Sequence, residues 1–592
     1  RVLAALGALA PHLARNADFA LAVIRIAVHR LFTPQSEVTD AVLEFLQKFG
    51  AVAPEALAKL LWAEADAAPD RRSKGLLYLA LSRMPAAAGP ERLAQAAAQL
   101  LAGWSDSDFD CRRSTAALLP LGDAAVNALL QAIPSAPAPQ RPLLIRLADQ
   151  VCQRAEVTDE AVDRHARVLV ELIRTSRKPA RLAALESRSV ERAAEATRTE
   201  LAMHVLASAH DYNLDDVVHL SDAFLVRLGK PAIRELHKSA KSSPWPVERG
   251  IAIRSLDAIL TAPGAPSREA GETLRTLLDL YKAGKFPDEA LLARVLGRIA
   301  ALSPAPAAAV RGTTIELRTL LRDHPGKFEL LEAYSWAVSS RHIETEQKMN
   351  AGLTLLGLLD SRMPEDFVKE TWTNDGLELR IDRTSTAHTV LIPTLVNGLV
   401  RIALSGTGSD LFLEKITEGL LGHWKKVTGG EVMWSPANVT DLAAGLGRIA
   451  GRRETPLHLR LNVIEALRIK LVHAPVARAV GEALSIEESS RRMEALCSVV
   501  ARDLCALAVH RDFQDMDDRV ALLGSLGRIA AREKLAGNGE MSEDLRRRCV
   551  ELLFDGTRDS VPGTRDLLVA IAASAAVPKA VRKGISDRLG RS

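Results

Sequence analysis

Aromatic residues are scarce in this chain of 592 residues, where Phe, Trp and Tyr together make up 4%. Alternating patterns typical of β-strands are almost absent as well. Since 47% of the residues are apolar all the same, most of these are Ala, Leu, Val and Ile. Together with 25% charged residues, this composition favours helices throughout and argues against an all-β or a disordered chain.

Long apolar runs are also missing. The best candidate for a membrane span, Thr389–Leu404, is too short, contains Pro393 and Asn397, and carries Arg401 near its end. No signal-peptide pattern is found. We therefore expect a cytoplasmic protein with no membrane span.

Cysteines are few and unpaired in the sequence. The five are Cys111, Cys152, Cys497, Cys505 and Cys549, and no two of them form a CxxC motif. We expect small buried residues in a reducing compartment rather than a disulfide framework.

Neither sign of charge dominates, because the chain contains 77 Lys and Arg residues and 73 Asp and Glu residues, which gives a net charge of +4. This balance argues against a dedicated nucleic-acid coat protein. Three local basic clusters, Arg174–Arg181, Leu545–Arg548 and Val577–Ser592, keep a basic groove for nucleic acid open as an alternative.

Motifs for catalysis are lacking: there is no Gly-rich phosphate loop, no GxSxG and no HExxH. The densest polar cluster comprises His204, His210, Asp211, Asp215, Asp216 and His219. Its adjacent His-Asp pair is similar to that of metal-dependent HD-type phosphohydrolases, with His165 as a possible further ligand. The segment is more typical of a link between helices whose Asp residues cap the next helix. We expect no enzyme, no cofactor and no metal.

Amphipathic helices are what the chain does contain. Ser36–Gly50 shows a helical apolar stripe that ends at a glycine, and Val157–Ile173 begins with a Thr cap. Most such segments run for about 12–20 residues, with short links of Pro, Gly, Ser or Asp between them. Helices of this length with short links pack antiparallel to their neighbours.

Helix pairs recur along the chain. Leu121–Ile133 aligns with Leu228–Ala240: both open with Leu-Gly, and both place Ala and Leu at matching positions. We expect the glycine to end one helix in a left-handed conformation, with the next helix beginning within three residues.

These residues resemble the HEAT-repeat (armadillo-like) family of α-solenoids. The resemblance is sharpest in Leu228–Leu260, where Val247, Arg249 and Ala252 occupy the second helix, and in Ser105–Leu130. It implies an all-α solenoid of stacked antiparallel helix pairs, about fourteen or fifteen in number. Such a fold presents a curved surface for protein partners.

The pentapeptide LGRIA occurs three times, at Leu296–Ala300, Leu446–Ala450 and Leu526–Ala530. We interpret these as equivalent helix ends in stacked units, with Leu, Ile and Ala facing neighbouring helices and Gly permitting close approach. On a period near 40 residues, the two spacings predict four units and then two.

One segment does not fit a helix. In Phe367–Thr384, Leu377, Leu379 and Ile381 alternate with charged residues after the turn signal Asn374-Asp375-Gly376. We predict an inserted β-hairpin. A second irregular stretch is expected at Trp424–Pro436, followed by a helix with Ser435 as its cap and Pro436 as its first residue.

Insertions in solenoids often contact partners, and exposed tryptophans are enriched at such contacts. The candidate partner-binding residues are Trp372, Asn374, Asp375, Trp424, Lys425, Lys426 and Trp434. The alternative is that the tryptophans fill a gap where the hairpin packs on its own solenoid.

The sequence thus predicts a HEAT-like array over residues 1–362, a β-hairpin insertion over 363–390 and a second array over 391–592. The function that we expect is a non-enzymatic scaffold for one or more protein partners. A nucleic-acid-binding solenoid with a basic inner groove is the alternative.

Overall fold

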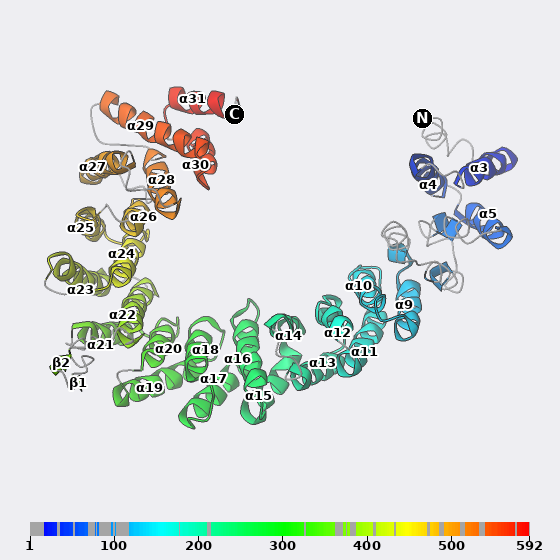
Figure 1. Ribbon diagram of the computed structural model, residues 1–592, viewed down its shortest axis with the longest axis horizontal. Coiled ribbons are helices and arrows are strands. Elements are labelled where there is room, and N and C mark those ends of the chain that lie inside the picture. Colours follow the sequence, from blue (N-terminus) through cyan, green and yellow to red (C-terminus); the bar gives the residue numbers. More distant parts are fainter. Residues whose placement is uncertain are drawn as a thin grey trace. The chain divides into compact units, whose positions relative to one another are not determined.

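The computed structural model describes residues 17–31, 36–50, 54–68, 77–78, 80–81, 96–98, 101, 118–176, 178–209, 215–324, 327–360, 371–373, 376–378, 386–405, 410–430, 434–470, 474–484, 491–508, 516–531, 539–574 and 577–590. The chain divides into two compact units, Arg1–Ala265 and Pro266–Ser592. The elements of each unit are labelled in Figure 1.

The first unit contains α3 (Ala17–Leu31), α4 (Ser36–Gly50), α5 (Pro54–Ala67), η2 (Leu119–Leu121), α9 (Asp123–Ser135), α10 (Arg141–Cys152), α11 (Asp159–Thr175), α12 (Lys178–Leu185), η3 (Ser189–Arg192), α13 (Glu195–Ser208), α14 (Asp215–Leu228), η5 (Lys230–Ala232), α15 (Ile233–Ser242) and α16 (Pro246–Thr261).

The second unit contains α17 (Ser267–Lys282), α18 (Glu289–Leu302), α19 (Ala307–Asp323), α20 (Phe328–Val338), α21 (Thr345–Asp360), β1 (Thr371–Thr373), β2 (Gly376–Glu378), α22 (Thr386–Ser405), α23 (Asp410–Thr428), α24 (Pro436–Ala450), α25 (Leu457–Arg468), α26 (Ala474–Ala483), α27 (Arg491–Ala508), α28 (Met516–Ala530), α29 (Gly539–Arg558), α30 (Thr564–Ala573) and α31 (Lys579–Leu589).

Helices of the second unit alternate between two layers. One layer, called here the close-packed layer, consists of α18, α20, α22, α24, α26, α28 and α30, each of which contacts the next member of the layer. The helices between them form the second layer, in which α17 contacts α19, and α21, α23, α25, α27 and α29 follow in contact with one another. This alternation is the architecture of an α-solenoid, in which stacking buries the apolar face of each helix pair.

The LGRIA pentapeptides all lie in the close-packed layer, in α18, α24 and α28. Leu, Ile and Ala of each copy have no exposed surface. A Cβ on Gly297 would lie 2.6 Å from Cα of Ala333 on α20, and one on Gly447 would lie 2.6 Å from Cα of Ala479 on α26. The glycines therefore allow close approach to the next helix of the layer, as the sequence predicts.

The count of units between the first two copies needs correction. From α18 to α24 the layer takes three steps, through α20 and α22, rather than the predicted four. The extra length lies between α21 and α22, where residues 361–385 separate two helices that contact each other. From α24 to α28 there are two steps, as predicted.

Leu-Gly turns separate helices in the first unit as expected. Gly122 has φ +54° between η2 and α9, and Gly229 has φ +66° between α14 and η5. Only glycine adopts this region at little cost, and open space surrounds both positions. The conformation of the turn, not crowding, requires glycine here.

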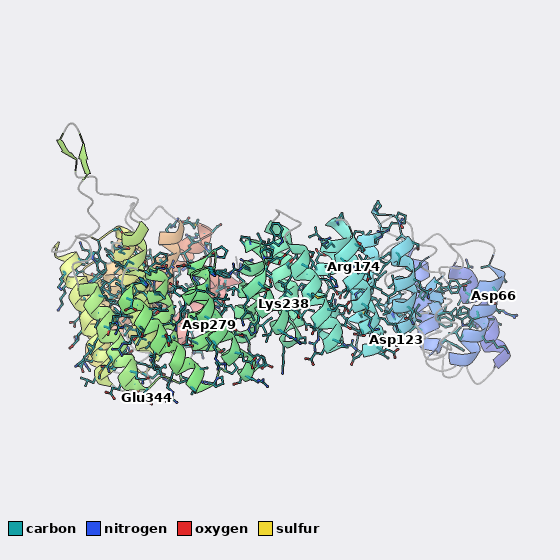
Figure 2. The ribbon with its side chains drawn as sticks, turned by 90° about the horizontal axis from the view of Figure 1, so that it is seen from below. Asp66, Asp123, Arg174, Lys238, Asp279 and Glu344 are labelled. Atoms are coloured by element: carbon teal, nitrogen blue, oxygen red, sulfur yellow. The ribbon has the colours of Figure 1, made fainter. Side chains whose placement is uncertain are left out.

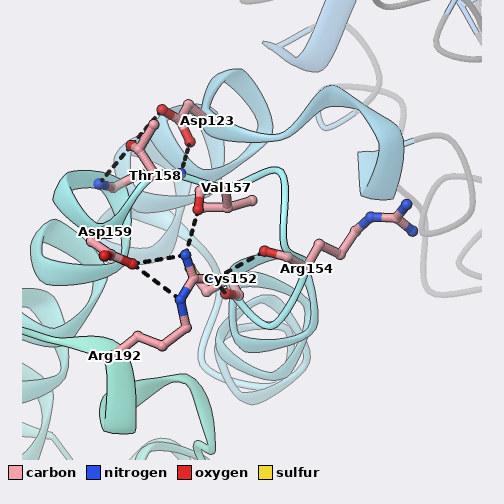
Figure 3. A network of polar contacts seen from close by, with 8 residues as sticks. Asp123, Cys152, Arg154, Val157, Thr158, Asp159 and Arg192 are labelled. Atoms are coloured by element: carbon pink, nitrogen blue, oxygen red, sulfur yellow. Dashed lines mark hydrogen bonds and ion pairs between the residues drawn. The ribbon is translucent and has the colours of Figure 1, made fainter.

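Arginine side chains close several helix C-termini from the neighbouring element. The Arg192 guanidinium donates to the carbonyls of Cys152 and Arg154 at 2.9 Å each and of Val157 at 2.6 Å (Figure 3). The same group pairs with Asp159 at 2.8 Å. Cys152 ends α10, and Arg154 and Val157 lie in the link that follows it, so the guanidinium donates to this helix end and link and ties them to η3.

The link between α10 and α11 is held from a second side. Asp123, the first residue of α9, accepts hydrogen bonds from the backbone N–H and the hydroxyl of Thr158, at 2.9 and 2.6 Å (Figure 3). Thr158 in turn caps α11 by accepting from the N–H of Ala161. The predicted Thr cap is therefore confirmed.

Arginines elsewhere in the chain also donate to carbonyls at helix ends. Arg249 on α16 donates to the carbonyl of Ala240 at 3.1 Å, which explains the arginine of the HEAT-like pattern. Arg460 on α25 is 1% exposed and donates to the carbonyls of Ala450 and Thr455 at 2.9 and 3.0 Å, and to those of the link between them. A buried guanidinium is tolerated because carbonyl oxygens satisfy its donors.

In the segment of the predicted hairpin, the structure describes two three-residue strands. β1 and β2 pair antiparallel, with Trp372 opposite Leu377. Residues 361–370, 374–375 and 379–385 lie outside the described part, and so do Leu379 and Ile381 of the predicted strand. The hairpin as a whole, and the division of the chain at 363–390, stay predictions.

Buried cysteines agree with the sequence interpretation as far as they are described. Cys152, Cys497, Cys505 and Cys549 are buried in the core, and the Sγ atoms of Cys505 and Cys549 lie 3.6 Å apart. Cys111 lies outside the described residues. No helix among those described is both long and apolar enough to cross a membrane.

Candidate interaction surface

The candidate residues of the sequence analysis fall into three groups. Trp372 lies on β1, and Asn374 and Asp375 lie outside the described residues. Lys425 and Lys426 are exposed in the last turn of α23, where positive charge is favourable at a helix C-terminus. The structure therefore supports exposure of the lysine pair.

Trp424 requires a correction, because it has no exposed surface. It lies inside α23 rather than in an irregular stretch, and its indole Nε1 donates to the carbonyl of Ala466 on α25 at 3.0 Å. A tryptophan that is buried in this way cannot act as an exposed anchor. Trp424 packs within its own array, against α25.

Trp434 occupies an intermediate position. It is partly exposed before α24 and stacks on His423, with ring centroids 5.8 Å apart and planes inclined by 22°. Ser435 accepts from the N–H of Asn438 with Pro436 at the first helical position, so the predicted cap is confirmed. Trp434 is thus packed over α23 and remains accessible in part.

A different set of residues lies on the exposed side of the close-packed layer. Arg298 on α18 and Arg448 on α24 are the arginines of two LGRIA copies, and Arg401 on α22 belongs to the related sequence LVRIA at Leu399–Ala403. Trp336 lies on α20, between α18 and α22. We call Arg298, Trp336, Arg401 and Arg448 the arginine strip.

Contacts along the strip join consecutive helices. The Arg401 guanidinium lies 3.7 Å from the centroid of the Trp336 ring and donates to Oγ of Ser335 at 2.8 Å. Arg298 approaches the same ring from α18, with its guanidinium carbon 5.9 Å from the centroid. Cation–π attraction of this kind stabilises both arginines on one indole.

Arg448 extends the strip to α24. It is exposed and donates to Oδ1 of Asn397 on α22 at 2.7 Å. Burial lowers the pKa of Arg401 to about 10, with Glu332 opposing this shift and the like charges of Arg448 and Arg298 adding to it. Arg298 and Arg448 therefore both lie within electrostatic range of Arg401, and Arg401 stays protonated at neutral pH.

Carboxylates are interspersed with the strip. Glu332 on α20 pairs with Arg294 of α18 at 3.4 Å. Burial raises the pKa of Asp441 on α24, and the nearby charge of Arg448 opposes this shift. The surface is therefore positive along the strip but not uniformly basic. Elsewhere, exposed charges of both signs cover the helices, as Lys238, Asp279 and Glu344 illustrate (Figure 2).

The strip is not among the surfaces predicted from the sequence, although the sequence contains a signal for it. The packing role of Leu, Gly, Ile and Ala in LGRIA leaves the arginine of the motif unexplained. An arginine that recurs at one position of a buried helix motif is expected on the side of the layer that faces solvent. The basic clusters chosen instead are largely engaged: Arg174 pairs with Glu171, Arg547 pairs with Glu543, and Arg546 is buried.

The polar cluster around His204 and His219 shows no catalytic arrangement that can be described. His165 is fully buried on α11, and His210 and Asp211 lie outside the described residues. Among the residues that are described, no group of three or more His, Cys, Asp or Glu side chains could hold a metal ion.

Comparison with known proteins gives only distant structural resemblances. No protein-family model and no curated protein matches the chain. The chain is similar to the solved structure of the Kap95:Nup1 complex at 12% identity and a TM-score of 0.45, over 97% of this chain and 72% of the other. It is also similar to the karyopherin Kap121p bound to the SUMO protease Ulp1p, at 12% identity and 0.48, over 93% and 56%. A third similar structure is the S. pombe condensin Cnd3–Cnd2 subcomplex, at 12% and 0.36, over 94% and 71%.

Such scores carry no argument about function, so the fold stands on the chain's own packing. Alternate helices contact each other in two layers, Leu-Gly turns separate helices, and arginines close helix ends. The chain is an α-solenoid of HEAT-like helix pairs.

Proposed function

We propose that the chain is a non-enzymatic scaffold for protein–protein interaction, and that partners bind along the exposed side of the close-packed layer in the second unit. The observation that carries the proposal is the repetition of large polar or aromatic side chains on successive helices of this layer, at Arg298, Trp336, Arg401 and Arg448. Stacked repeats create such extended surfaces, and multivalent contacts along them give affinity without a deep pocket.

A second contact region is proposed at the insertion between α21 and α22. Trp372 on β1, with Asn374 and Asp375 of the predicted turn, would then contact a partner at the turn of the predicted hairpin. Lys425, Lys426 and Trp434 form a separate candidate contact at the end of α23. Trp424 takes no part, because it is buried. The cytoplasmic location that we propose is supported by the buried cysteines Cys152, Cys505 and Cys549, which favour a reducing compartment.

Binding of nucleic acid is the second candidate function, and the arginines of the strip favour it over catalysis. It predicts an affinity that falls steeply with salt, since each phosphate contact releases counterions. A protein partner that docks through shape and mixed charge would show a weaker dependence.

The test is site-specific photocrosslinking in cells that produce the protein. A photoreactive residue at Ala444, in line with the strip on α24, should capture defined proteins, whereas one at Ile315 on α19 of the second layer, which is 64% exposed, should not. Nuclease treatment before analysis separates the two candidates. Loss of all protein crosslinks after nuclease, with nucleic acid attached to position 444, would reject the scaffold.

A further inference from the structure

Two arginines of the strip, Arg401 and Arg448, make hydrogen bonds that do not neutralise their charge. Arg401 and Arg448 are held by neutral oxygens, the hydroxyl of Ser335 and the side-chain amide of Asn397. A neutral acceptor fixes the direction of a guanidinium but leaves its charge uncompensated. Within the described residues, Glu332 is the carboxylate close to Arg401, and it already pairs with Arg294.

The guanidiniums are also positioned in advance. The Trp336 ring fixes Arg401 from one side, and Ser335 accepts from Nη1, so this side chain has little rotamer freedom left to lose on binding. Ordering a long side chain at an interface usually costs about 0.5–1.5 kcal/mol. An arginine that is already ordered therefore favours an anionic ligand more than a mobile surface arginine does.

The character of the strip favours a peptide over nucleic acid. Carboxylates at Glu332 and Asp441 lie beside the arginines and would repel a phosphate backbone. The indole of Trp336 is covered by the Arg401 guanidinium at 3.7 Å, so this face does not offer a stacking platform for a base. A peptide of mixed sequence tolerates isolated carboxylates, because it places its own acidic residues only where arginines are found.

The spacing of the strip suits an extended chain. Packed helices lie about 8–10 Å apart, so Arg401 on α22 and Arg448 on α24, which are consecutive helices of the layer, are separated by about that distance. Arg298 comes from α18, two helices before α22, but its guanidinium lies 5.9 Å from the Trp336 ring centroid and that of Arg401 lies 3.7 Å from it, so these two also lie within about 10 Å of each other. An extended peptide advances about 3.3 Å per residue and reaches the next helix after about three residues. We propose that the arginine strip binds an extended acidic segment of a partner protein, with Asp or Glu at about every third residue.

This inference deepens the proposed scaffold function and rests on it. The probe is a fluorescent peptide of repeated Glu-Ser-Ala, about twelve residues long and thus long enough to cross from α18 to α24. Its counterparts are a Lys-Ser-Ala peptide and a single-stranded oligothymidylate of matching length. Binding to the full chain is measured by fluorescence anisotropy at low and at physiological ionic strength.

We expect the Glu-Ser-Ala peptide to bind, and Arg448→Glu to weaken it about tenfold or more, because a charge-assisted contact becomes a repulsion. The same variant should bind the Lys-Ser-Ala peptide more tightly than the native chain does. The matched control is Arg275→Glu on α17, an exposed arginine of the second layer, which should leave the affinity unchanged within about twofold. Arg401→Gln removes a second charge of the strip without reversing it and should also weaken binding of the Glu-Ser-Ala peptide. Circular dichroism shows whether this variant keeps its helical fold.

Two outcomes would overturn the inference. An equal loss of peptide affinity in Arg448→Glu and Arg275→Glu would show a general charge effect. Absence of Glu-Ser-Ala binding to the native chain would show that the strip does not take an acidic peptide. In either case, protein crosslinks at position 444 would still uphold the scaffold. Tighter binding of oligothymidylate than of the peptide, lost in Arg448→Glu, would instead assign the strip to nucleic acid and reject both proposals.

Discussion

Close approach of α18 and α20 depends on a single missing methyl group. A Cβ on Gly297 would lie 2.6 Å from both Cα and the carbonyl oxygen of Ala333. These are backbone atoms, which cannot rotate away as a side chain can. Gly297→Ala therefore has to push the two helices apart by roughly 1 Å to restore ordinary contact.

The expected magnitude follows from two opposing effects. Overpacking in a well-packed core costs about 1–3 kcal/mol, and backbone neighbours place this case near the upper end. Alanine gains about 1 kcal/mol over glycine in a helix. We expect Gly297→Ala to lower the free energy of unfolding by about 2 kcal/mol.

A matched control lies one helix further along the chain. Gly312 on α19 is exposed and nothing lies within 4 Å of its virtual Cβ, so Gly312→Ala gains helix propensity without a clash. This variant should raise the free energy of unfolding by up to about 1 kcal/mol. The same chemical change thus has opposite signs at the two sites.

Urea unfolding followed by circular dichroism gives the two free energies. Hydrogen exchange of the α18 and α20 amides then localises the effect, because stacked repeats open in part before the whole array unfolds. Faster exchange confined to these helices in Gly297→Ala would support the reasoning. A shift of the same sign and size in both variants would refute it.

Three further predictions concern the interior, and two of them have a control substitution at a more exposed site. Arg460→Leu leaves buried carbonyls without donors and should destabilise by about 3 kcal/mol in urea unfolding, whereas Arg453→Leu at an exposed site should change little. Burial lowers the pKa of His165 to about 4 from 6.5, so the unfolded state binds the proton first as the pH falls. The free energy of unfolding should then drop by about 3 kcal/mol between pH 6.5 and 4, and His165→Leu should remove this part of the slope; equal slopes would contradict the burial argument. Trp424→Ala should cost about 3–5 kcal/mol in thermal and urea unfolding, but Trp434→Ala, at a partly exposed site, clearly less.

Much of the fold could be predicted because its signals are local. The glycine of a Leu-Gly turn predicts a positive φ, as found at Gly122 and Gly229, and a threonine such as Thr158 predicts the start of a helix. Apolar residues three and four positions apart predict a buried helix face, and this pattern predicts the packing role of LGRIA. Each inference needed only a few neighbouring residues.

The candidate surface could be predicted only in part, because exposure depends on distant neighbours. Trp424 and Trp434 stand ten residues apart in one polar stretch, yet α25 covers the first and leaves the second partly accessible. Counting along the sequence also gave four units where three exist, since a fixed period cannot distinguish inserted residues from a repeat. Exposure and repeat number are properties of the packed array.

The sequence by itself determined that the chain forms paired helices, where their turns lie, and which residues of each helix are apolar. Only the tertiary structure decided which helices share a layer and which polar side chains line up across them. Arg298, Arg401 and Arg448 are separated by 103 and 47 residues in sequence, as their numbers show, but stacking brings them onto one strip with Trp336. Local conformational preference acts over a few residues, whereas a surface for a partner arises from contacts between helices far apart in the chain.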